Sequence, residues 1–160
     1  MSEPLVTENI VVTRLFDAPI ERVWRAWTTD EDVQRWWGPD TFTAPTTKMD
    51  VREGSTSLVC MRSPDAQYFW MTWDYAQVIP NERLQYVQNL TDNKGRRIDP
   101  TSVGMGPEFP RDVATTVTLV PEDGKTRMTI TETTTTTAFM MKMSTMGLEQ
   151  CMDKMGKIFL

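Results

Sequence analysis

Histidine is absent from this chain of 160 residues, and its absence excludes more chemistry than any other feature of the composition. Without histidine there is no Ser-His-Asp or Cys-His triad, no histidine-ligated zinc and no imidazole general base. Cysteine is nearly absent as well, because Cys60 and Cys151 are too few for a disulfide scaffold and too far apart for a metal knuckle. We therefore expect both cysteines to be small core residues, and we predict neither a metal site nor a cofactor.

Three further absences restrict the partners of the protein. No Lys/Arg run forms a basic patch and the net charge is −5, so binding to nucleic acid is disfavoured. No segment has the roughly 18 consecutive apolar residues of a membrane span. The first residues lack a basic region followed by an apolar stretch, so no signal peptide is expected and the cytoplasm is the default compartment.

The remaining composition, with 39% hydrophobic and 24% charged residues, is typical of a globular chain. A chain of this length buries about 70% of the surface that it exposes when unfolded, so it needs no disulfide or metal to hold it together. No internal repeat is present. We therefore predict a single domain over residues 1–160.

The first forty residues change from a strand pattern to a helix pattern. Apolar side chains alternate over residues 10–16, which predicts a strand. After Pro19, which suits a first helical position, apolar residues recur at helical spacing as far as Trp27. A second short helix is predicted before residue 40, with Thr29 as its N-cap and Asp32 at the capping-box position.

From residue 41 to residue 136 the apolar pattern has a period of two, which is typical of strands. Short turn sequences such as Glu53-Gly54 and Pro80-Asn81 separate the segments, so we predict a largely antiparallel sheet. One connection is long: residues 91–110 hold several glycines and prolines and are interpreted as a functional lid or a disordered loop. The predicted strands are residues 42–52, 55–62, 68–79, 83–89, 113–120 and 126–136.

The last segment, residues 139–160, returns to helical spacing and carries a broad apolar stripe rich in methionine. A helix of this length is about 33 Å long, enough to cross a whole sheet. The element order predicts an α+β fold in which a curved antiparallel sheet of seven strands wraps around this helix, with two short helices after the first strand. Such an arrangement leaves a cavity between the sheet and the helix.

Several ordered motifs resemble those of a known family. The opening segment matches the pattern F-x-A-P-x-x-x-V-W-x-A-W, and W-W-G-P and D-x-R-x-G follow it. The matching segments are residues 16–27, 36–39, 50–54, 80–84, 124–130 and 146–155. Over nearly its whole length the chain resembles the activator of heat-shock protein 90 ATPase homologue family, within the START/Bet v-like helix-grip superfamily (SRPBCC).

The resemblance implies the helix-grip fold that the element order also predicts, but it implies function only in outline. Superfamily relatives bind lipids, hormones or polyketides in the cavity, and a few catalyse cyclisation there. The cochaperone after which the family is named has a separate N-terminal domain for which this chain has no room, so chaperone activation is not expected. Trp73 stands where the family usually has glycine and Leu148 where it usually has tryptophan. We expect the indole of Trp73 to fill part of the pocket.

We predict that the aromatic strand 68–79 and the methionine-rich helix form the walls of a pocket for a small apolar or amphipathic molecule. For any single residue of this set, ordinary core packing is the alternative. The predicted cavity residues are Phe42, Met61, Phe69, Met71, Trp73, Tyr75, Tyr86, Val117, Met128, Ile130, Met143, Met146, Cys151 and Met155.

Two other classes of function stay open. An enzyme acting in the same cavity would draw on carboxylate, guanidinium or phenol groups. The candidates are Asp50, Arg52, Arg62, Asp74, Tyr86 and Glu132. We interpret Asp50 and Arg52 as a structural ion pair, and no carboxylate pair has glycosidase spacing, so binding is preferred to catalysis. A protein-partner module would use Trp36 and Trp37 as anchors, although we expect them to close the pocket. A homodimer is a further open alternative.

Overall fold

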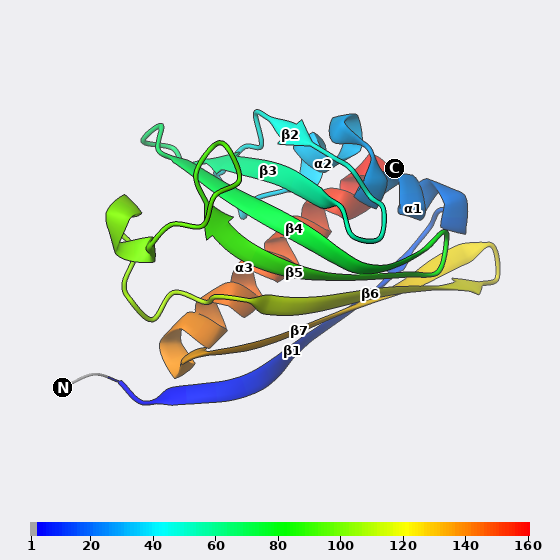
Figure 1. The fold of residues 1–160 in the computed structure, drawn as a ribbon. Helices are drawn as coiled ribbons and strands as arrows, with labels where there is room; N and C mark the ends of the chain where they lie inside the picture. Colours follow the sequence, from blue (N-terminus) through cyan, green and yellow to red (C-terminus); the bar gives the residue numbers. More distant parts are fainter. Residues whose placement is uncertain (1–2) are drawn as a thin grey trace.

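The computed structural model describes residues 3–160 and has the predicted α+β helix-grip architecture, with a curved sheet wrapped around a long helix (Figure 1). The elements are β1 (Leu5–Phe16), α1 (Ile20–Thr28), α2 (Asp30–Trp36), β2 (Thr47–Lys48), β3 (Thr56–Arg62), β4 (Tyr68–Ile79), β5 (Arg83–Thr91), η1 (Pro100–Val103), β6 (Val113–Glu122), β7 (Lys125–Thr137) and α3 (Ala138–Ile158). The strands form one antiparallel sheet in the order β1-β7-β6-β5-β4-β3-β2, and α3 lies across its concave face.

The alternation of side chains along the strands determines what α3 covers. β1 and β7 pair along their whole length, which brings the first and the last strand of the sheet together. Ile10, Val12 and Phe16 of β1 are buried on the concave face, while the intervening Val11 is exposed. The predicted period of two is thereby confirmed for this strand, since successive side chains of a strand point to opposite faces.

The predicted strand over residues 42–52 is wrong in its extent. Only Thr47–Lys48 forms a strand there, together with one isolated bridge to β3. Pro45 has no N–H to donate to a neighbouring strand, which interrupts the ladder. Further along, the Arg52 guanidinium donates to both carboxylate oxygens of Asp50, at 2.7 and 2.8 Å, in a turn rather than a strand. The predicted structural ion pair between Asp50 and Arg52 is confirmed.

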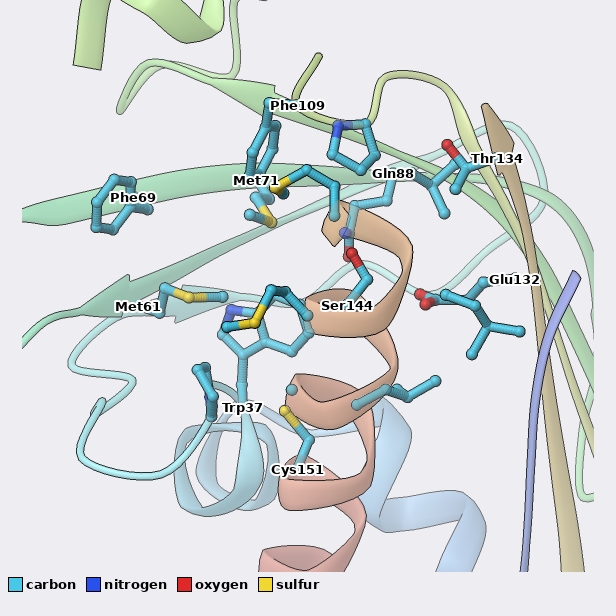
Figure 2. Close-up of a pocket in the computed structure, with 18 of the residues that line it drawn as sticks. Trp37, Met61, Phe69, Met71, Gln88, Phe109, Glu132, Thr134, Ser144 and Cys151 are labelled. Atoms are coloured by element: carbon cyan, nitrogen blue, oxygen red, sulfur yellow. The ribbon is translucent and has the colours of Figure 1, made fainter. Parts of the chain in front are cut away.

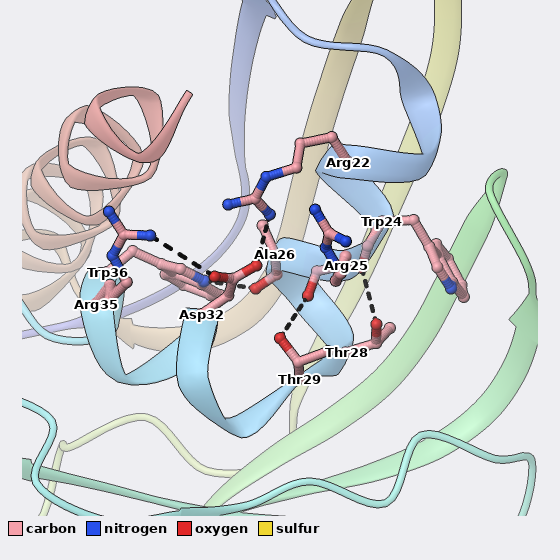
Figure 3. Close-up of polar contacts among 9 residues, drawn as sticks. All are labelled: Arg22, Trp24, Arg25, Ala26, Thr28, Thr29, Asp32, Arg35 and Trp36. Atoms are coloured by element: carbon pink, nitrogen blue, oxygen red, sulfur yellow. Dashed lines mark hydrogen bonds and ion pairs between the residues drawn. The ribbon is translucent and has the colours of Figure 1, made fainter. Parts of the chain in front are cut away.

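The corner between α1 and α2 is held by hydrogen bonds that differ from the predicted cap. Thr29 precedes α2, but its hydroxyl donates back to the carbonyl oxygen of Arg25 in α1, at 3.0 Å (Figure 3). Asp32 accepts a hydrogen bond from the Arg22 guanidinium at 2.5 Å instead of completing a capping box. Thr29 thus occupies the predicted N-cap position, but the predicted capping box is not formed, because a short hydroxyl side chain can bond a preceding backbone carbonyl equally well.

Tryptophans from this corner meet Trp73 of β4 in the centre of the core. Trp36 Nε1 donates to the carbonyl oxygen of Ala26 at 2.7 Å and so fixes α2 against α1 (Figure 3). The Trp73 ring lies 5.2 Å from that of Trp37 and 6.2 Å from that of Trp36, measured between centroids. On its other side Trp73 stacks on Tyr86 at 4.9 Å. The indole is fully buried and occupies the middle of the concave face.

The C-terminal half of α3 is attached to the loop between α2 and β2. Lys154 Nζ donates to three backbone carbonyl oxygens of this loop, at 2.7 to 3.1 Å, those of Gly38, Pro39 and Phe42. This contact uses all three donors of the ammonium group. No helix among residues 3–160 combines the length and the apolar character that a membrane crossing requires.

Replacing Trp73 by alanine is expected to lower the free energy of unfolding by about 3–5 kcal/mol, because the change empties the centre of the core. Trp70 provides a matched control, since it lies on the opposite face of β4 and is only partly buried. Trp70→Ala should cost clearly less. Urea denaturation followed by circular dichroism measures both losses, and equal losses would contradict the central role of Trp73.

Candidate functional site

A cavity of about 260 Å³ lies between the sheet and residues 140–151 of α3 (Figure 2). Its wall is mostly apolar and comes from strands, loops and helix alike. The residues lining it are Ile10, Trp37, Pro39, Phe42, Met61, Phe69, Met71, Gln88, Met105, Phe109, Pro110, Val113, Glu132, Thr134, Met140, Met143, Ser144, Gly147, Leu148 and Cys151. Because Met143 both lines the cavity and is 44% exposed, the mouth of the cavity lies at this turn of α3.

The register of the sheet explains where the cavity ends. One row of paired residues crosses four strands and contains Tyr86, Thr115, Glu132 and Ile10. The row on the cavity side contains Gln88 and Val113, with Thr134 two residues beyond Glu132. The row on the other side contains Leu84, Val117, Ile130 and Val12, all buried in closed core. Glu132 therefore lies at the boundary between the cavity and the closed core.

The structure divides the predicted cavity residues into two groups. Those in the cavity wall are Phe42, Met61, Phe69, Met71, Met143 and Cys151. Those in the closed core are Trp73, Tyr75, Tyr86, Val117, Met128, Ile130 and Met155. Met146 belongs to neither group and is 44% exposed. The α3 positions that line the cavity recur at spacings of three and four residues, and Met146 lies off that stripe.

The long connection between β5 and β6 covers one side of the cavity. Its contribution to the lining is Met105, Phe109 and Pro110. The connection is attached to the sheet, because the Thr136 hydroxyl of β7 donates to the carbonyl oxygen of Glu108 at 2.5 Å. A second hydrogen bond, from Gln67 Nε2 to the carbonyl oxygen of Val103 at 2.8 Å, attaches the connection to the segment before β4. Its opening and closing as a lid stays a prediction.

Glu132 is the one acidic residue in this wall, and the lining residues include no lysine or arginine. Burial raises the pKa of its carboxyl from 4.5 to about 7, since the apolar surroundings disfavour the charged form. No hydrogen bond or ion pair joins it to another residue in the described part of the chain. Figure 2 shows the carboxyl pointing from β7 into the space beside α3, on the opposite side of the cavity from Met61 and Phe69.

Other polar groups of the wall also lack partners. The Trp37 Nε1–H and the Thr134 hydroxyl are buried without a hydrogen bond to any residue within 3–160. Gln88 is oriented by Trp73, whose Nε1 donates to Gln88 Oε1 at 2.8 Å. That bond leaves the amide N–H₂ of Gln88 free to donate elsewhere. Buried polar groups are nearly always paired, so unpaired ones gathered around one cavity point to a missing partner there.

Metal binding has no such support. Among residues 3–160, no group of three or more cysteine, aspartate and glutamate side chains is arranged to hold a metal ion. Cys151 is a poor ligand candidate, because burial raises the pKa of its thiol to about 12.

Sequence reasoning named Glu132 only as one of several groups for catalysis and missed the polar residues around it. Gln88 and Thr134 have the same parity as buried neighbours on their strands, and this parity was the signal that could have found them. Ser144 lies one residue after Met143 on the lining stripe of α3. The side chains contributed by residues 105–110 carried no periodic signal.

Comparison with known proteins identifies relatives along nearly the whole chain. The family model described as "Activator of Hsp90 ATPase homolog 1-like protein" (AHSA1) matches residues 17–159. No curated protein matches the chain. A protein of Chromobacterium violaceum is 22% identical, with a TM-score of 0.78 over 94% of this chain and 96% of that one.

Two further solved structures are similar to this chain to the same degree. A protein of Arthrobacter aurescens is 23% identical, with a TM-score of 0.76, covering 94% of this chain and 85% of that one. A protein of Staphylococcus epidermidis is 21% identical, with a TM-score of 0.76, covering 99% of this chain and 93% of that one. At these identities the likeness shows a common fold.

Glu132→Gln is expected to change how stability depends on pH. The carboxyl ionises near pH 4.5 in the unfolded chain and near pH 7 in the folded protein, so the folded state holds the proton more tightly between these values. This contribution to stability is fully present below pH 4.5 and is lost as the pH rises through 7, a change of about 3 kcal/mol.

Urea denaturation of wild type and Glu132→Gln at about pH 5 and about pH 8 measures this effect. The variant should gain stability relative to wild type as the pH rises. A difference between the two proteins that stays constant over this range would contradict the raised pKa of this partly buried carboxyl.

Proposed function

We propose, since the chain belongs to the AHSA1 family of Activator of Hsp90 ATPase homolog 1-like proteins, that its function is to bind a small apolar or amphipathic molecule between the sheet and α3. The helix-grip fold of this family is in general a ligand-binding fold. The observation that carries the proposal is the cavity itself, an apolar space that retains a few unpaired polar groups. That combination is typical of small-molecule sites, in which apolar walls bury the ligand and a few polar groups fix its orientation.

The size of the cavity limits the ligand. Its volume of about 260 Å³ lies just below the 300–1,000 Å³ of pockets for drug-sized molecules. A ligand with one or two rings, or a short chain, matches this space. Met61, Met71 and Met143 in the wall support adaptable binding, because the unbranched, polarizable methionine side chain adjusts to ligand shape.

Catalysis in the same cavity is the second candidate, and one observation favours it. A carboxyl with a pKa near 7 suits a general acid or base at neutral pH. A catalytic base is, however, normally held in place by a hydrogen bond to another residue. Because Glu132 has no such bond within residues 3–160, binding remains the better supported function.

A protein-partner module has less support. Trp36 and Trp37 are 1% and 8% exposed, so these side chains offer little surface to another protein. The proposal keeps the expectations of a single domain over residues 1–160 and of a cytoplasmic location, and leaves a homodimer open.

A larger side chain inside the cavity should weaken ligand binding. Ser144 lines the cavity, and Figure 2 shows its side chain directed into it, so Ser144→Leu is expected to weaken binding of the neutral fluorescent probe N-phenyl-1-naphthylamine at least tenfold. Lys142→Leu, on the exposed side of the same helix, is the matched control and should leave the affinity unchanged. Fluorescence titration measures both. Equal affinity in wild type and Ser144→Leu would place the probe outside the cavity and contradict the proposal.

A further inference from the structure

We propose that the cavity recognises a protonated amine on its apolar ligand, with the Glu132 carboxylate as the partner of the ammonium group. This inference rests on the proposed function and specifies the chemical class of the ligand. It follows from the charge of the wall, from the lack of a partner for Glu132 and from the other hydrogen-bond acceptors of the same wall.

The charge of the wall selects the sign of the ligand. Glu132 is the only charged side chain among the lining residues, so an anionic ligand would meet repulsion without any compensating cation. A purely apolar ligand would leave the carboxyl without a partner, and a neutral donor would supply a hydrogen bond but no counter-charge. A cationic group supplies the missing counter-charge.

No lysine or arginine among residues 3–160 forms an ion pair with Glu132. Lys154, one turn after Cys151 on α3, is committed to the three carbonyl oxygens of the α2–β2 loop. Arg14 of β1 is paired with Asp153 at 2.5 Å. The acidic partners of the ion-paired arginines in the described structure all lie outside the cavity wall, so none of these ion pairs reaches Glu132.

The cavity wall holds other hydrogen-bond acceptors besides Glu132. A primary ammonium has three N–H donors. Thr134, two residues along β7 on the same face, has a buried hydroxyl without a partner. Ser144 of α3 also lines the cavity, and its hydroxyl points toward the end of the Gln88 side chain (Figure 2). The carboxylate can accept from a cationic nitrogen, and the two hydroxyls are further acceptors in the same wall.

The titratable groups that face Glu132 from the elements packed against it are Tyr86 on β5 and Cys151 on α3. Burial raises the pKa of both groups, that of Cys151 to about 12, so both stay neutral near pH 7. The residues paired with Glu132 in the sheet, Thr115 and Ile10, do not titrate. Glu132 is therefore the group in this wall whose charge changes near neutral pH, and affinity for a cation should follow its ionisation.

Three probes of nearly equal shape test the inference: 1-naphthylmethylamine, 1-naphthalenemethanol and 1-methylnaphthalene. At pH 8 wild type should bind the amine at least tenfold more tightly than the hydrocarbon. Between pH 6 and pH 8 its affinity for the amine should rise about tenfold, because the ionised fraction of Glu132 rises through its pKa of about 7. The affinities for the alcohol and the hydrocarbon should not rise over this range.

Two Glu→Gln variants distinguish the effect of the Glu132 carboxylate on amine affinity from that of the overall charge of the protein. Glu132→Gln should lose the preference for the amine and its pH dependence while still binding 1-methylnaphthalene. Glu21→Gln, at an exposed position of α1, which contributes no residue to the cavity wall, should behave as wild type. If Glu132→Gln does not fold, the test is the pH dependence of the wild-type affinities. The affinity for the amine should rise between pH 6 and pH 8 and that for the alcohol should not, and equal behaviour of the two probes would overturn the inference.

The two possible failures are distinct. Binding of the hydrocarbon without any preference for the amine at any pH would overturn the role of Glu132 and leave the proposed function standing. Failure of all three probes to bind would overturn the proposed function itself.

Discussion

The concave face of the sheet changes from closed core to open cavity at Trp73, and the arrangement of both halves depends on how this indole packs. Its ring fills the space between the sheet and the α1–α2 corner, against Trp36, Trp37 and Tyr86. Its Nε1–H donates to Gln88 and so orients an amide of the cavity wall. A single side chain thus closes the core on one side and sets the polarity of the cavity on the other.

Much of the fold could be predicted from the sequence because it depends on short-range patterns. A period of two and a period of 3.6 distinguish strands from helices, and turn residues such as Pro80-Asn81 mark the hairpins. The prediction failed for residues 42–52, where Pro45 and the Asp50–Arg52 ion pair interrupt a pattern that otherwise suits a strand. The alternation of apolar residues along the sequence does not show where a proline or a local ion pair prevents strand pairing.

The site was harder to predict than the fold, since its extent depends on the packing of elements far apart in sequence. Parity placed Trp73 and Met71 on the same face of β4, but only the tertiary contacts show that one closes the core and the other lines the cavity. The side chains of residues 105–110 reach the cavity because Thr136 holds the loop over it. Polar lining residues such as Gln88 were missed because inward positions were searched for apolar side chains.

The polar groups of the cavity wall lower the stability of the fold, and this cost itself argues for a role in binding. An apolar residue at position 132 would continue the closed core formed by Val117 and Ile130, without the cost of a partly buried carboxyl that has no partner. Thr134 and Trp37 add a hydroxyl and an N–H that find no partner within residues 3–160. Elsewhere this protein pairs its polar groups closely, as Lys154 does with three carbonyl oxygens. Within residues 3–160 the buried side-chain groups without a partner both lie in the wall of this cavity, and a ligand that pairs with them is the best explanation.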